Sequence, residues 1–117
     1  MTSSPMKLSS RPKSIGPAQL ARMKPSAVLI NTCRGDVIDE PALIDALQNG
    51  TIRAAGLDVF DREPLVDSPF FGMPNVMLSG HLAGTTYDTF FRRAQFAFEN
   101  IQGISSGSPP MAVVTET

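Results

Sequence analysis

The sequence has little of what defines several large classes of proteins. One cysteine among 117 residues excludes an internal disulfide framework and any site built from several cysteines. No apolar run approaches the roughly 18 residues of a membrane span, and the start of the chain lacks the apolar segment of a secretory signal. Ten Lys and Arg against eleven Asp and Glu leave no basic excess for nucleic acid. We therefore expect a cytoplasmic protein with neither a membrane nor a nucleic-acid partner.

The length allows one compact domain. Residues 1–15 are rich in Ser, Pro and Lys, which predicts a flexible leader. Residues 16–105 carry the apolar patterning and are the predicted domain, and the polar residues 106–117 are expected to form a tail.

Strand and helix patterns alternate along the predicted domain, which indicates an α/β fold with a mostly parallel sheet. The expected strands cover residues 27–31, 54–60 and 75–79, and the expected helices cover 16–23, 39–50 and 87–104. The first strand is a continuous apolar run, which is typical of a strand buried on both faces.

Several apolar side chains are expected to pack inside the fold. The aromatic stripe of Phe90 and Phe98 on the last helix is predicted to be core packing. Phe70 and Phe71 are expected to attach the long loop to the body, and Cys33 is interpreted as a small hydrophobic residue behind the sheet.

Three ionisable residues follow the three expected strands: Arg34, Glu63 and His81. Because parallel sheets bind ligands at the carboxyl ends of their strands, the three side chains could face one crevice. An Arg there suits a carboxylate ligand, and a His with a carboxylate partner suits proton transfer. The pattern therefore indicates acid–base chemistry on a small anionic substrate.

Each of these residues also has a simpler interpretation when it is taken alone. Arg34 fits a solvated turn, Glu63 fits an exposed loop charge, and His81 fits a helix cap as well as it fits a catalytic group. Asp58, at the end of a strand, is more commonly a turn or cap residue. A metal hydrolase built on His81 is disfavoured, because the sequence contains no second histidine and we expect no metal site.

Longer blocks of sequence decide between these interpretations. The chain resembles the D-isomer-specific 2-hydroxyacid dehydrogenases from about Leu20 to Ile101, in order and with similar spacing. The blocks that carry the resemblance are residues 23–35 (MKPSAVLINTCRG), 57–64 (LDVFDREP), 74–76 (PNV) and 81–85 (HLAGT).

The resemblance implies a fold and a reaction. The fold is α/β, the C-terminal half of a Rossmann-type, mostly parallel NAD-binding domain in truncated form. By position, Arg34 would hold the substrate carboxylate, His81 would be the general acid and base, and Glu63 its carboxylate partner. The implied reaction is reversible reduction of a small 2-oxo acid to a D-2-hydroxy acid, in a parent protein that is commonly a homodimer.

The resemblance also implies the cofactor, which is NAD, with NADP as a possibility. Asp58 matches the aspartate that contacts the nicotinamide carboxamide. The residues that match cofactor-lining positions are Thr32, Cys33, Arg34, Asp58, His81, Leu82, Ala83 and Gly84.

The sequence departs from the family in three ways. Gly80 stands where many relatives have Pro, Cys33 stands where Ala is commoner, and no G-x-G-x-x-G phosphate-binding loop occurs anywhere. We therefore expect little or no turnover from the 117-residue chain alone. The alternative is a non-catalytic interaction module, or a partner of a separate polypeptide, because the family also includes corepressors that keep these residues.

Overall fold

The computed structural model describes residues 13–115 and divides the chain into two compact units, one ending at Leu82 and one beginning at Ala83. Most of the expected leader and the last two residues of the expected tail lie outside the described residues. The boundary between the units falls inside the segment 16–105.

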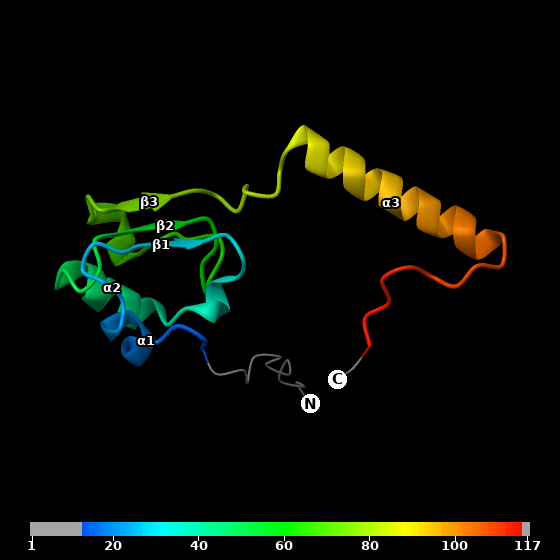
Figure 1. Ribbon diagram of the computed structural model, residues 1–117. Helices are drawn as coiled ribbons and strands as arrows, with labels where there is room; N and C mark the ends of the chain where they lie inside the picture. Colours follow the sequence, from blue (N-terminus) through cyan, green and yellow to red (C-terminus); the bar gives the residue numbers. More distant parts are fainter. Residues whose placement is uncertain (1–12, 116–117) are drawn as a thin grey trace, which may run out of the picture. The chain divides into compact units, whose positions relative to one another are not determined.

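The first unit alternates helices and strands (Figure 1), as the sequence predicts. Its elements are α1 (Pro17–Ala21), β1 (Val28–Asn31), the 3₁₀ turn η1 (Gly35–Val37), α2 (Glu40–Gln48), β2 (Ala54–Leu57), the 3₁₀ turn η2 (Pro69–Gly72) and β3 (Val76–Leu78). The strands form one parallel sheet in the order β1-β2-β3.

Local sequence determines where α2 begins and ends. The Asp39 side chain accepts a hydrogen bond from the backbone N–H of Ala42 at 3.1 Å, which satisfies a donor that the first turn leaves free. Pro41 lies in that first turn, where its missing N–H costs nothing. Gly50 adopts a positive φ of 72° just beyond the helix, a conformation that glycine accepts without strain.

The core lies on one face of the sheet, where both helices pack (Figure 1). The helices contribute Leu20 of α1 and Leu43 of α2, both at most 1% exposed. Ala55 and Leu57 of β2 point to the same side and are buried against them. Alternation along β2 therefore separates a packed face from an open one.

The opposite face of the sheet is open, which corrects the expectation that the first strand is buried on both sides. Val28 and Ile30 of β1 are 54% and 64% exposed, and Met77 of β3 is 77% exposed. A parallel sheet needs helices on both faces, and the first unit supplies them on one only. The prediction of a strand from the apolar run is therefore confirmed, and the prediction that both its faces are buried is wrong.

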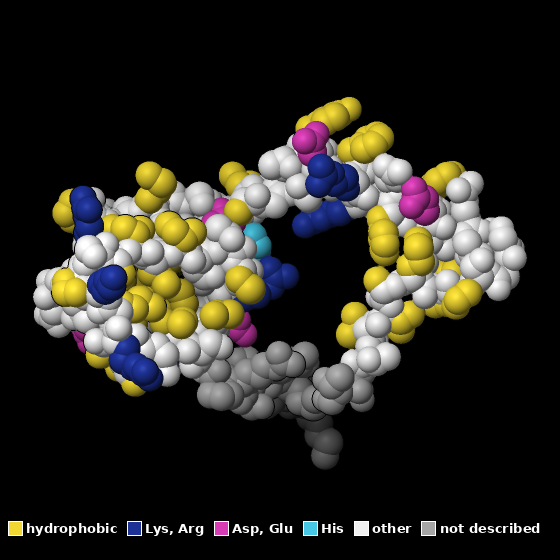
Figure 2. Space-filling model, viewed as in Figure 1, with side chains coloured by type: hydrophobic (Ala, Val, Ile, Leu, Met, Phe, Trp, Pro, Cys, Tyr) yellow, Lys and Arg dark blue, Asp and Glu magenta, His cyan; other side chains and the backbone are white. Residues whose placement is uncertain are grey.

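The second unit contains α3 (Tyr87–Ser105). Thr86 caps its N-terminus, because the Thr86 hydroxyl accepts a hydrogen bond from the backbone N–H of Thr89 at 3.1 Å. None of its residues is buried, and Phe90 and Phe98 are each 61% exposed. The expected core packing of that stripe is therefore wrong, since the described part of this unit offers no surface against it. Figure 2 shows hydrophobic side chains projecting from α3 between charged ones.

Within residues 13–115, no helix combines the length and the apolar content needed to cross a bilayer.

One of the two phenylalanines in the long loop attaches it to the body. Phe70 is 1% exposed and its ring lies 6.5 Å from that of Phe60. Phe71 is 57% exposed, so its expected attachment role is wrong. Both belong to η2, a 3₁₀ turn in which adjacent side chains point in different directions, and only one of them can face the core.

A close backbone approach joins the loop after β1 to the loop after β2. Gly35 is buried, and a Cβ atom added there would overlap the backbone of Phe60 and Asp61. Only glycine permits this approach. Gly35 adjoins Arg34, and Phe60 lies three residues before Glu63, so the contact fixes the distance between two of the predicted site residues.

Gly35→Ala is expected to destabilise the first unit by about 3 kcal/mol or more, because a rigid backbone segment would have to move. Urea unfolding followed by circular dichroism measures this. Gly72→Ala is the matched control, since a Cβ atom there meets nothing within 4 Å, and it should change stability little. Equal stability of the two variants would show that the loops can separate freely.

Candidate active site

The three predicted site residues follow the three strands at one edge of the sheet. Parallel pairing aligns Asn31 with Leu57 and Leu57 with Leu78, so all three strands end together. The loops that follow carry Arg34, Glu63 and His81. This edge is where open α/β sheets bind their ligands.

The loop after β1 is held by a buried asparagine. Asn31 is 6% exposed, and its side chain accepts from the backbone N–H of Cys33 at 3.0 Å and donates to the carbonyl of Arg34 at 2.9 Å. Sequence reasoning did not assign a role to Asn31. The signal for it in the sequence was a polar residue at the end of an apolar run, because such a residue needs hydrogen-bond partners when it is buried.

Arg34 presents its side chain toward solvent. Its Nη1 donates to the carbonyl of Cys33 at 3.0 Å, and among residues 13–115 no carboxylate forms an ion pair with it. The guanidinium keeps several donors for a ligand. Cys33 is exposed rather than packed behind the sheet, which corrects the interpretation of it as a small core residue.

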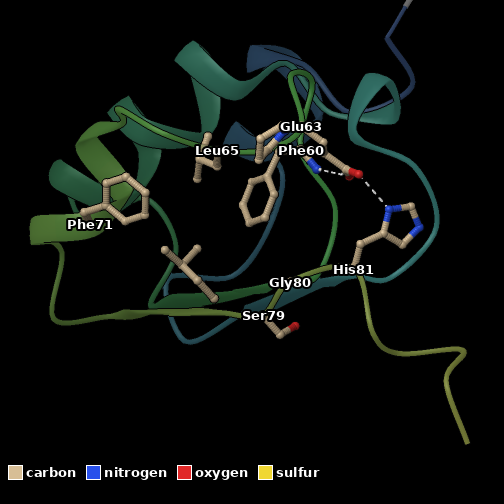
Figure 3. Close-up of a pocket in the computed structure, with 9 residues that line it drawn as sticks. Phe60, Glu63, Leu65, Phe71, Ser79, Gly80 and His81 are labelled. Atoms are coloured by element: carbon tan, nitrogen blue, oxygen red, sulfur yellow. Dashed lines mark hydrogen bonds and ion pairs between the residues drawn. The ribbon is translucent and has the colours of Figure 1, made fainter.

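Glu63 and His81 form a direct pair, and their side chains point toward each other in Figure 3. Glu63 Oε2 lies 2.7 Å from His81 Nδ1, and Glu63 Oε1 accepts from the backbone N–H of Phe60 at 3.1 Å. Both carboxylate oxygens are therefore occupied, one by the ring and one by the backbone. This fixes the orientation of Glu63 although its side chain is 36% exposed.

These two bonds change the charge behaviour of Glu63. The hydrogen bond with His81 lowers the pKa of the carboxyl below its ordinary value of 4.5, and the Phe60 N–H lowers it further. Glu63 is thus a carboxylate at neutral pH, and a carboxylate can only accept hydrogen bonds. His81 Nδ1 therefore carries the proton of this bond, which leaves Nε2 as the ring nitrogen available to a ligand.

The backbone at His81 has a positive φ of 60°. For a non-glycine residue this conformation costs about 1–3 kcal/mol and persists only where neighbouring contacts hold it. Asp58 supplies two such contacts: its Oδ1 accepts from the Ser79 hydroxyl at 2.7 Å and from the Leu82 backbone N–H at 2.8 Å. Asp58 is 4% exposed, so these bonds are shielded from water.

Arg34, Glu63 and His81 line one polar hollow of about 420 Å³, so the structure brings the three predicted residues together. An apolar pocket of about 620 Å³ opens beside it and shares Glu63 and His81 (Figure 3). A cation at one side and an acid–base pair at the other suit an anion with an exchangeable proton. No group of three or more His, Cys, Asp or Glu in the described part of the chain could hold a metal ion.

Besides Arg34, Asp58 and His81, the residues predicted to line the cofactor fall into two sets. Thr32, Cys33 and Leu82 are exposed at the ends of β1 and β3, beside the polar hollow. Ala83 and Gly84 open the second unit. The sequence contains no G-x-G-x-x-G loop that could bind the pyrophosphate of a dinucleotide.

Glu63→Gln is expected to lower stability in a pH-dependent way. A lowered carboxyl pKa adds stability above the ordinary value of 4.5, and this is lost as the pH falls through the lowered value. The gap between the wild type and the variant should therefore close in acid. Urea unfolding from about pH 3 to about pH 6 measures it, with exposed Asp67→Asn as the control. A gap that stays constant with pH would contradict the pairing.

Comparison of the sequence with known proteins identifies the family. Residues 7–83 match the family model described as D-isomer specific 2-hydroxyacid dehydrogenase, NAD binding domain. The glyoxylate/hydroxypyruvate reductase B of Yersinia enterocolitica is 53% identical over 95 residues, which are 80% of this chain and 29% of that protein. The chain thus spans less than a third of the length of that relative.

Solved structures agree. A D-isomer specific 2-hydroxyacid dehydrogenase from Xanthobacter autotrophicus in complex with NADPH and MES is 40% identical, with a TM-score of 0.78 over 88% of this chain and 42% of that one. The D-mandelate dehydrogenase of Rhodotorula graminis is 34% identical, with a TM-score of 0.81 over 91% and 31%. They confirm the expected α/β fold, part of a Rossmann-type domain. The chain therefore belongs to the D-isomer-specific 2-hydroxyacid dehydrogenase family.

Proposed function

We propose that this chain supplies the acid–base and carboxylate-binding residues of an NAD(P)-dependent reductase of small 2-oxo acids, with glyoxylate and hydroxypyruvate as the first candidates. The observation that carries the proposal is the 2.7 Å Glu63–His81 pair in one hollow with Arg34, which forms no ion pair among residues 13–115. The similarity to a glyoxylate/hydroxypyruvate reductase supports the choice of substrates.

Arg34 binds the substrate carboxylate in this proposal. A guanidinium presents parallel N–H donors that match the two oxygens of a carboxylate. Asn31 holds the carbonyl of Arg34 and the N–H of Cys33, so the side chain starts from a fixed backbone. The substrate would therefore be oriented by its carboxylate, with C2 toward His81.

His81 exchanges the proton at the C2 oxygen. During reduction, Nε2 donates a proton to the carbonyl oxygen as negative charge develops there, and during oxidation it takes that proton back. Glu63 keeps Nδ1 protonated and stabilises the imidazolium that each cycle needs. In this proposal the Glu63–His81 pair therefore performs the proton transfer.

The nicotinamide cofactor supplies the hydride when it is bound. In this proposal its nicotinamide end would contact Thr32, Cys33, Arg34, Asp58, His81, Leu82, Ala83 and Gly84. NAD and NADP are both candidates. A cytoplasmic location and a homodimeric parent protein belong to the same proposal, and the exposed single cysteine suits a reducing compartment.

A chimaera tests the assignment directly. The 95 matched residues of the Yersinia enterocolitica reductase would be replaced by those of this chain. We expect the purified chimaera to reduce glyoxylate or hydroxypyruvate with NADH or NADPH. His81→Asn in the chimaera should lower kcat by about 100- to 10,000-fold, because the proton donor is lost.

Asp67→Asn is the matched control, since Asp67 is an exposed loop residue away from the hollow. It should leave the rate unchanged. A folded chimaera without activity, or full activity in His81→Asn, would refute the assignment. The first result would favour a non-catalytic interaction module, the alternative that the exposed apolar side chains of α3 make reasonable.

Arg34→Lys separates binding from chemistry in the same chimaera. A lysine keeps the charge and loses the planar pair of donors, so the KM for the 2-oxo acid should rise about tenfold or more. Steady-state kinetics with varied 2-oxo acid at saturating cofactor measures this. An unchanged KM for the 2-oxo acid would exclude Arg34 as the carboxylate-binding residue.

A further inference from the structure

We infer that Asp58 is a positioning residue for His81, acting through Ser79 and Leu82. The inference rests on the proposed function, because it concerns how the acid–base residue is held. Asp58 was matched above to a cofactor contact, and this second role depends on bonds within the chain.

Asp58 holds the chain on both sides of His81. Its Oδ1 accepts from the hydroxyl of Ser79, two residues before His81, and from the backbone N–H of Leu82, the next residue. The distances are 2.7 Å and 2.8 Å. One oxygen atom therefore joins the two ends of the turn that contains the left-handed His81.

The two ends of this arrangement are fixed to the sheet. The backbone N–H of Asp58 donates to the carbonyl of Asn31 at 3.0 Å, and that of Ser79 donates to the carbonyl of Leu57 at 3.0 Å. Asp58 thus continues the pairing of β2 with β1, and Ser79 continues that of β3 with β2. The carboxylate is a rigid, 4% exposed anchor.

Gly80 contributes no side-chain support to the turn. A Cβ atom at Gly80 would meet nothing within 4 Å, so no packing holds this position. Glycine is also the residue with the most conformational freedom. The bonds from Asp58 therefore replace the restraint that a stiffer residue before His81 would give.

The consequence for the ring is geometric. His81 reaches Glu63 at 2.7 Å from a backbone conformation that histidine adopts only when it is held. If the turn relaxes, the direction of the Cα–Cβ bond changes and Nδ1 leaves Glu63. By holding the turn, Asp58 therefore determines the direction in which Nε2 points, without contacting the substrate itself.

Nuclear magnetic resonance on the full 117-residue chain tests this, since His81 is the only histidine and its ring signals are unambiguous. The readouts are the exchange of the His81 Nδ1–H with water and the exchange of the Leu82 amide. The loss variants are Ser79→Ala and Asp58→Ala. The conservative variants are Ser79→Thr, which keeps the hydroxyl, and Asp58→Asn, which keeps one acceptor oxygen.

We expect Ser79→Ala and Asp58→Ala to speed exchange of the Nδ1–H about tenfold or more, and Ser79→Thr to restore it. The Leu82 amide should also exchange faster in Asp58→Ala. The controls Ser26→Ala and Asp67→Ala, both at exposed positions, should match the wild type. Circular dichroism melts show which variants are folded, and Ser79→Ala, which removes one hydroxyl, decides the question if Asp58→Ala unfolds.

The inference would be overturned if the Nδ1–H of folded Ser79→Ala exchanged at the wild-type rate. It would also be overturned if Ser79→Thr exchanged as fast as Ser79→Ala. Neither result depends on catalysis. An inactive chimaera would refute the proposed reaction and leave the positioning of His81 to be decided by these signals alone.

Discussion

Parallel pairing of three short strands determines where every polar group of the site lies. Because Asn31, Leu57 and Leu78 are aligned across the sheet, the loops that follow them leave from one edge. Residues 29 and 18 positions apart in the sequence then line one hollow. Helices α1 and α2 stabilise this alignment from one face, so a core of modest size is sufficient to define the geometry of the acid–base pair.

Buried polar residues at the strand ends connect the core to the site. Asn31 and Asp58 are the two polar residues buried in the described chain, and each holds the backbone of a loop that carries a site residue. Such groups are costly to bury without partners, and here the partners are loop N–H and hydroxyl groups. Their burial therefore makes loop conformations as well defined as the sheet itself, while Arg34 and His81 remain exposed for a ligand.

The sequence predicted the order of helices and strands and the meeting of Arg34, Glu63 and His81. Those features depend on local chemistry and on the rule that parallel strands end together. Burial of β1 on both faces and of Phe90 and Phe98 could not be predicted, because periodicity reports which side chains seek a partner and not whether one is present. The role of Ser79 also needed the register, since its partner Asp58 follows another strand.

The polar contacts of the site are complete within the first unit, whereas its apolar surface is only partly covered. The Glu63–His81 bond, the Asp58 bonds and the Gly35 approach all lie within residues 31–82 and need no other surface. The uncovered face of the sheet and the exposed side chains of α3 concern apolar area, which requires contact with a larger body. A chain that spans 29% of the length of a relative can therefore hold the Glu63–His81 pair through its own contacts while its apolar faces stay uncovered.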